Sequence, residues 1–452
     1  MSDSSSTNRD SKFLSQRARR AIEPEDWTRF HEYAPRIKFF STSGFGYEVG
    51  AQDTWLPVFE VLSAAIETPH IFPNLQTLWW LVAGPWFPYA RLFLCPRMKS
   101  LVLGHLKTPA HFALLPTLPR WCPLLTSVTL RTAQQLYMNC RPCSLMVCRM
   151  AFLEKLDVDN IDQNAFEHIS QLETLKSLAV KRAPDFTPSR PAADVHRFPN
   201  LRELTLSKVS LEFLTAFIEM NEFWSFERLD AYMTSTPIAA ETARLYALIG
   251  TKCDPTTLTT LTLRASSTRG SLSVDLLARG IVTFDAICPL LRMKSLQQVS
   301  LAPPGGFSLD DSGIEAVARA WPDILTLDLP GSEYRGPPPR VTLSGIRAFA
   351  RHCPRLVVLS TPFDASVVPD EDVVLPHEAL RLLIVEDAVL VDPAVVAEYL
   401  GAMFPKLEAI GTAIRREVVE DVRERADRLH ALWKEVGLAP ARVTATAVKI
   451  TA

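Results

Sequence analysis

The most regular feature of the sequence is a recurring pattern of leucines and polar residues. In its clearest copy, Leu204 and Leu206 alternate with Glu203 and Thr205, and Leu201 leads into them. Alternation with a period of two is typical of a short strand that buries one apolar face. One such strand cannot bury its face alone, so the recurrence predicts a stack of similar repeats.

The pattern returns between residues 75 and 412, at steps that average about 28 residues. Between the predicted strands, apolar residues recur at helical spacing in 210–222, 312–320 and 344–352. A proline such as Pro322 or Pro405 then ends the helix before the next strand. This alternation predicts an α/β leucine-rich-repeat solenoid, with a curved parallel sheet on its concave side, helices on its convex side and helical caps.

Both ends of the chain depart from the repeat pattern. The first residues are polar, aromatic residues recur on one helix face from Trp27 to Tyr33, and Val418 to Trp433 keeps an apolar stripe among many charges. We therefore expect a disordered tail (1–20), an N-terminal helical cap or linker (21–70), the solenoid (71–414), a C-terminal capping helix (415–437) and a flexible tail (438–452).

Composition indicates which partners and which cellular compartment to expect for the protein. A formal net charge of -2 gives no reason to expect non-specific nucleic-acid binding. The uncharged run 72–90 contains three prolines and is not expected to span a membrane. The polar N-terminus does not resemble a signal peptide, so we expect an intracellular protein, cytoplasmic or nuclear. Four of the eight cysteines precede proline, which favours buried, reduced thiols: Cys95, Cys122, Cys288 and Cys353.

The segment from Asp26 to Ile37, together with the repeats and their Cys-Pro and Trp-Pro turns, resembles the fungal F-box leucine-rich-repeat proteins from Trp27 to about Gly437. In that family an F-box docks on a Skp-type adaptor of a cullin-RING ubiquitin ligase, and the repeats bind the substrate. The residues before Trp27 lack the Leu-Pro-x-Glu opening of an F-box. The resemblance therefore implies substrate recognition by the repeats; the alternative is a genuine ligase receptor with a lost or divergent F-box.

The polar residues that alternate with the buried ones are predicted to face outward on the concave sheet and to form a protein-binding surface. The predicted contact residues are Trp79, Arg131, Lys155, Asp157, Asp159, Glu203, Arg228, Asp230, Tyr232 and Arg264. Trp79 belongs to an aromatic group with Trp80, Trp86, Phe87 and Tyr89, which could instead line a ligand pocket or fill the core. We expect a chain that is monomeric by itself, with no cofactor and no nucleic-acid or membrane partner.

A different class of function is suggested by Cys140-x-x-Cys143, followed by Cys148. Thiolates two residues apart can share a zinc ion, so a zinc-containing domain or a metal-dependent enzyme is the alternative. A fourth ligand is not evident, since His168 belongs to another repeat, and a thiol cluster in the core or a loop explains the same residues.

Asp157, Asp159 and Asp162 could form a calcium or general-acid cluster, but alternating outward positions on one strand explain the first two. The sequence contains no phosphate-binding loop, nucleophile elbow or His-Glu-x-x-His motif. We therefore predict a non-catalytic protein.

Overall fold

The structure is a computed structural model. It describes residues 24–43, 51–66, 68–82, 84–132, 140–182, 184, 186–188, 196–265, 278–331, 339–370, 376–385, 388–390, 392–411, 431–436 and 442–444. The chain divides into two compact units. Unit 1 comprises Met1–Phe186 with Phe198–Asn200, and unit 2 comprises Thr187–Arg197 with Leu201–Ala452.

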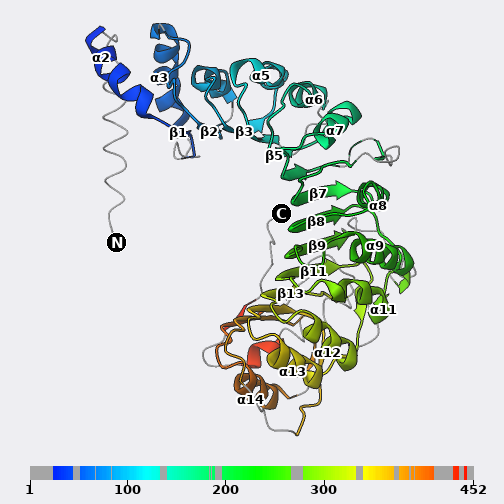
Figure 1. Cartoon of the computed structure of the whole chain (residues 1–452). Helices are drawn as coiled ribbons and strands as arrows, with labels where there is room; N and C mark the ends of the chain where they lie inside the picture. The colour runs from blue at the N-terminus through cyan, green and yellow to red at the C-terminus, as the bar shows by residue number, and fades with distance from the viewer. Residues whose placement is uncertain are drawn as a thin grey trace, which may run out of the picture. The chain divides into compact units, whose positions relative to one another are not determined.

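Unit 1 contains parallel strands that pair in chain order: β1 (Phe39–Ser41), β2 (Thr77–Trp80), β3 (Ser100–Leu106), β4 (Ser127–Thr132), β5 (Lys155–Val158) and β6 (Ser177–Val180). Its helices are α2 (Pro24–Tyr33), η1 (Ala34–Arg36), α3 (Ala51–Ala65), η2 (Gly84–Phe93), α4 (Pro109–Ala113), η3 (Leu115–Thr117), α5 (Leu118–Trp121), α6 (Arg141–Val147) and α7 (Gln163–Ser170). Figure 1 shows the helices that connect the strands on one side of the sheet.

Unit 2 continues the same architecture. Its main sheet is parallel in the order β7 (Glu203–Val209), β8 (Arg228–Met233), β9 (Thr260–Ala265), β11 (Gln298–Ala302), β13 (Thr326–Asp328), β14 (Val358–Ser360), β16 (Leu382–Ile384), β18 (Ala409–Gly411) and β19 (Arg442–Thr444). Its helices are α8 (Leu211–Glu219), α9 (Ala239–Lys252), α11 (Phe284–Ile287), η4 (Cys288–Arg292), α12 (Asp311–Ala320), α13 (Leu343–His352) and α14 (Pro393–Met403). Two short parallel pairs lie in the connections, β10 (Val282–Thr283) with β12 (Phe307–Ser308) and β15 (Asp364–Ala365) with β17 (Val389–Leu390).

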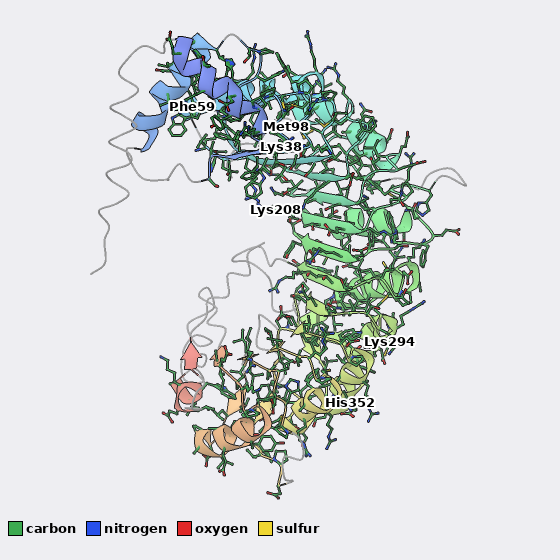
Figure 2. The ribbon with its side chains drawn as sticks, turned by 60° about the vertical axis from the view of Figure 1, so that its left-hand side comes forward. Lys38, Phe59, Met98, Lys208, Lys294 and His352 are labelled. Atoms are coloured by element: carbon green, nitrogen blue, oxygen red, sulfur yellow. The ribbon has the colours of Figure 1, made fainter. Side chains whose placement is uncertain are left out.

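Buried side chains line up in rows across each sheet. In unit 2 the register aligns Leu204 with Leu229, Leu261 and Val299, and each of the four is 1% exposed or less. Each such side chain contributes about 1.5–3 kcal/mol to folding by leaving water. In unit 1, Phe59 of α3 and Met98 before β3 (Figure 2) are buried in the core beside the sheet, with exposures of 3% and 0%. The predicted mixed α/β fold with a long parallel sheet is confirmed.

Four helices end in the same turn. At Cys122, Trp321, Cys353 and Phe404, ψ lies between 66° and 70°, outside the helical region, and each residue precedes a proline. Proline disfavours the helical conformation of the residue before it, so the helix ends there. In each turn, the backbone N–H of the residue three positions later donates to the carbonyl of the turn residue, at 3.0 to 3.3 Å. That later residue is the first apolar residue of the next leucine pattern.

The ends differ in part from the sequence-based expectation. The predicted tail 1–20 and most of the predicted capping helix lie outside the described residues. Trp433 of that segment is 1% exposed, and its Nε1 donates to the Ala388 carbonyl at 3.2 Å. For 438–452 the expectation of a tail is corrected at Arg442–Thr444, because β19 pairs in parallel with β18. Away from the ends, the prolines and aromatic residues of the uncharged run continue into the 3₁₀ helix η2, residues 84–93.

Candidate functional site

In unit 2, alternate side chains of each strand point away from the helices, and we call this side the open face. The register sets them in three rows: Arg228, Thr260, Gln298 and Thr326; Asp230, Thr262, Ser300 and Asp328; Tyr232 and Arg264. The helices that link these strands lie on the other side (Figure 1). The open face therefore gathers charges of both signs and an aromatic ring from four neighbouring strands.

Arg264 is the centre of a polar network on this face. Its Nη1 donates to Asp328 Oδ2 at 2.7 Å and to Ser300 Oγ at 2.9 Å, and the Ser300 hydroxyl donates to the same Asp328 oxygen at 2.8 Å. The Arg264 and Asp328 side chains are 29% and 14% exposed. Partial burial reduces solvent screening, so these bonds hold the guanidinium in one orientation more firmly than a fully exposed pair would.

Beside this network, Arg228 and Asp230 form an ion pair, with Nη1 and Oδ2 3.4 Å apart. Asp230 was predicted to be a contact residue, yet it is only 8% exposed, and it is less accessible than its outward position suggested. Its Oδ1 is buried and accepts no hydrogen bond within the described part of the chain. A buried carboxylate oxygen without a donor is costly, so this acceptor is suited to a donor that the described residues do not supply.

Tyr232 aligns with Arg264 in the register and follows Asp230 by two residues on β8. Burial raises the pKa of its hydroxyl; Asp230 adds to the rise, while Arg264 and Arg228 oppose it. The hydroxyl is therefore a neutral donor at ordinary pH. Glu203, also predicted as a contact, is half-buried and aligns with Arg228 in the register.

The other predicted contact residues belong to unit 1. Asp157 and Asp159 both approach Lys181, whose Nζ is 3.2 Å and 4.0 Å from their Oδ1 atoms. Burial raises the pKa of Asp159, and the charge of Lys181 counteracts this. Lys155 and Arg131 are exposed. The structure thus explains the aspartates of this strand as partners of a lysine on the neighbouring repeat.

Trp79 is 42% exposed and meets Phe39 edge to face, with ring centroids 5.5 Å apart. Trp80, Trp86 and Phe87 are 2% exposed or less, so all three pack in the core. Of the aromatic group, Trp79 is the member on the outward side of its strand, as predicted.

The cysteine motif lies around α6. Cys140 precedes the helix, Cys143 is 8% exposed within it, and burial raises the pKa of the Cys143 thiol, with nearby Cys140 adding to the effect. His168 Nε2 is 3.0 Å from the Met150 carbonyl, and Asp162 caps α7 by accepting from the Ala165 N–H. Across the described ranges, no three His, Cys, Asp or Glu side chains are placed to hold a metal ion.

The sequence analysis missed two residues of the unit 2 network, Ser300 and Asp328. Both follow the alternation used for the other strands, so extending it past Arg264 to the next two strands would have found them. Their hydrogen bonds to Arg264 cross 36 and 64 residues of sequence and become visible only with the register. Within the part of the chain that the structure describes, no helix has the length and apolar character needed to cross a membrane.

Comparisons with known proteins do not identify a family for the chain. No family model matches the chain, and no curated protein matches it. Among solved structures, it is similar to a chain of the crystal structure of the Rad7 and Elc1 complex in yeast, with 14% sequence identity and a TM-score of 0.46. That alignment covers 93% of this chain and 96% of the other. At this identity and TM-score, the likeness assigns neither a family nor a partner to the chain.

Proposed function

We propose that this protein is a non-catalytic recognition module of the leucine-rich-repeat class that binds another protein on the open face of unit 2. The observation that carries the proposal is the network of Arg264, Ser300 and Asp328 beside Tyr232 and the Arg228–Asp230 pair. A solenoid that curves toward this face would make it concave, which is the side such proteins use for binding.

The composition of the open face suits a protein partner. Arginine and tyrosine are enriched among the residues that dominate binding energy, and charges of both signs favour a partner with a complementary mixed surface. Arg264 is already oriented by Ser300 and Asp328, so less side-chain entropy is lost when a partner binds. A standard interface needs about 800 Å² on each side, which corresponds to several neighbouring strands of such a sheet.

The finer proposal follows from the resemblance to F-box repeat proteins. The bound protein would be a substrate that is brought to a ubiquitin ligase, and a Skp-type adaptor would contact the chain away from the open face. The competing proposal is a stand-alone binding scaffold with no ligase attached. The two differ in one observable, the presence of an adaptor in the purified complex.

The first experiment tests the open face. The full chain is used as bait in a host-cell lysate, beside an Arg228→Glu/Tyr232→Ala double variant and an Arg244→Glu control. Arg244 is a suitable control because it lies on α9 with a 73% exposed side chain, ion-paired to Glu219. We expect the double variant to lose the captured partner, with affinity falling about 100-fold or more, as for removal of two anchor residues.

Loss of capture can be attributed to the open face if the variants keep the far-ultraviolet circular dichroism and the melting temperature of the native chain. Capture that is unchanged in the double variant would place the binding site elsewhere. An adaptor and cullin that co-purify with both the native chain and the double variant would support the ligase receptor. A partner lost with the double variant, in the absence of any adaptor, would support the stand-alone scaffold.

A further inference from the structure

Charge is distributed very unevenly along the chain. From Thr68 to Leu153 there is no aspartate or glutamate, whereas the same stretch has eight basic residues: Arg91, Arg97, Lys99, Lys107, Arg120, Arg131, Arg141 and Arg149. The whole chain has a net charge of -2, so the remaining residues carry -10. Unit 1 therefore contains a strongly basic region that the overall charge conceals.

Three of these arginines meet at a groove in the connections of unit 1. The groove has a volume of about 640 Å³ and is formed by η2, α4, η3, α5 and the turn after α6. We call it the arginine groove, after Arg91, Arg120 and Arg149 on its walls. Its floor includes apolar side chains such as Phe87 and Leu114, and none of the described residues that line it is acidic.

The three guanidinium groups are available to a ligand. All three residues are exposed, and none of them forms an ion pair with another of the described residues. The Arg91 guanidinium lies over the Trp121 ring, 5.3 Å from its centroid, which is within the limit of about 6 Å for a cation–π contact. This contact fixes the position of one cation while leaving its N–H groups free to donate.

The aromatic rings of the groove argue for a peptide rather than a nucleic acid. Base binding needs free aromatic faces on which bases can stack. Here one face of Trp121 is covered by Arg91, and Phe87 is 2% exposed and stacks on His111 with centroids 4.1 Å apart. Guanidinium groups bind carboxylates in a bidentate manner, and the apolar floor suits an aliphatic or aromatic side chain between them.

We propose that the arginine groove binds an acidic segment of a partner protein. Carboxylates of that segment pair with Arg91, Arg120 and Arg149, and an apolar side chain of the segment packs on Leu114 and Pro116, which are half-buried in the lining of the groove. This site is built by the connections of unit 1 and not by the open face of unit 2, so it is a second binding surface that does not depend on the proposed function.

The test is fluorescence anisotropy with the full chain and a fluorescein-labelled peptide of sequence EELEEFEE. The test variant is Arg91→Gln/Arg120→Gln/Arg149→Gln. The matched control, Arg279→Gln/Arg292→Gln/Arg351→Gln, removes the same charge from exposed arginines of unit 2. We expect the groove variant to bind about tenfold more weakly, as for the loss of three partly exposed ion pairs, and the control to bind like the native chain.

Two further probes complete the design. The uncharged peptide QQLQQFQQ should bind at least tenfold more weakly than EELEEFEE, and the Arg228→Glu/Tyr232→Ala variant should bind EELEEFEE like the native chain. The proposal is overturned if EELEEFEE does not bind below about 1 mM, or if the groove and control variants weaken it equally. It is also overturned if single-stranded oligo(dT) binds the groove more tightly than the peptide, which would make the site a nucleic-acid site.

Discussion

Three buried side chains, those of Cys95, Cys353 and His377, form hydrogen bonds to the repeat before their own. The Cys353 thiol donates to the Ala318 carbonyl at 3.3 Å, and it lies 3.6 Å from the Trp321 carbonyl in the preceding turn. Cys95 donates to the Leu75 carbonyl at 3.1 Å, and His377 bonds the Cys353 carbonyl at 2.8 Å. These bonds join backbone carbonyls of one repeat to side chains of the next.

The thiols give a prediction at the residue scale. Burial raises the pKa of Cys122, Cys253 and Cys353 to about 12, so at pH 8 only about one molecule in 10⁴ carries each thiolate. The Cys288 side chain is exposed. Iodoacetamide at pH 8 should therefore label Cys288 first in the folded protein, and the three buried thiols only after unfolding, because the thiolate is the reactive form.

Peptide mass spectrometry after timed labelling provides the measurement, with protein unfolded in guanidinium chloride as the control. Equal rates at Cys353 and Cys288 in the folded protein would contradict the prediction. The sequence predicted buried thiols before proline, which is right for Cys95, Cys122 and Cys353. It is wrong for Cys288, which follows α11 with helical φ and ψ, so the chain continues directly into the 3₁₀ helix η4 instead of turning into a strand.

At the scale of elements, two strands are lengthened by a bulge. The register of β3 shifts between Leu103 and Leu106, and that of β7 shifts between Ser207 and Val209. His105 and Lys208 (Figure 2) occupy these bulges with φ of 55° and 53°. Side chains other than glycine are strained in this left-handed region, so the bulge is costly unless the surrounding strands hold it.

The bulge at Lys208 gives a prediction for stability. Lys208→Val should lower the free energy of unfolding by about 1–2 kcal/mol, because a β-branched residue fits the left-handed conformation poorly. Lys208→Gly should be neutral or stabilising, since glycine adopts that conformation freely. Urea unfolding of both variants measures the difference. The prediction fails if the valine and glycine variants are equally stable.

The strands were predictable because their signal is local, whereas the site was predictable only in part. Leu204 and Leu206 define their strand within a few residues, and the buried rows follow from repeating that pattern. The partner of Arg264, by contrast, lies on β13, and the choice of Asp328 depends on how β9, β11 and β13 align. Sequence alternation identified which residues face outward but not which of them bond to one another.

At the scale of the whole molecule, the main surprise is the separation of charge. The net charge of -2 gave no reason to expect a strongly basic region, but the stretch from Thr68 to Leu153 is wholly free of acidic residues. A sum over the chain cannot reveal such a region, because acidic residues elsewhere cancel it. The division into two units likewise has no counterpart in the leucine pattern, which continues through both.

This separation predicts unusual behaviour on ion-exchange resins. At pH 7.5 the native chain should be retained by a sulfonate resin despite its net negative charge, because a resin contacts one region of the surface at a time. The groove variant should elute at lower salt than the unit 2 control variant, although both lose three positive charges. Elution of the native chain in the flow-through would contradict this prediction, as would identical elution of the two variants.

The turn that ends α5, α12, α13 and α14 has a consequence for how such a chain diverges over generations. Each turn leads directly into the next leucine pattern. The hydrogen bonds of the Cys353 thiol likewise go to the adjoining repeat. Duplication or loss of a whole repeat therefore leaves every remaining boundary with a neighbour of the same kind. Insertion of a single residue within a strand would instead turn its buried side chains outward. During evolution, the spacing of buried residues within each repeat should therefore be preserved, while the number of repeats and the outward residues change. Binding of new partners can then arise without a new fold.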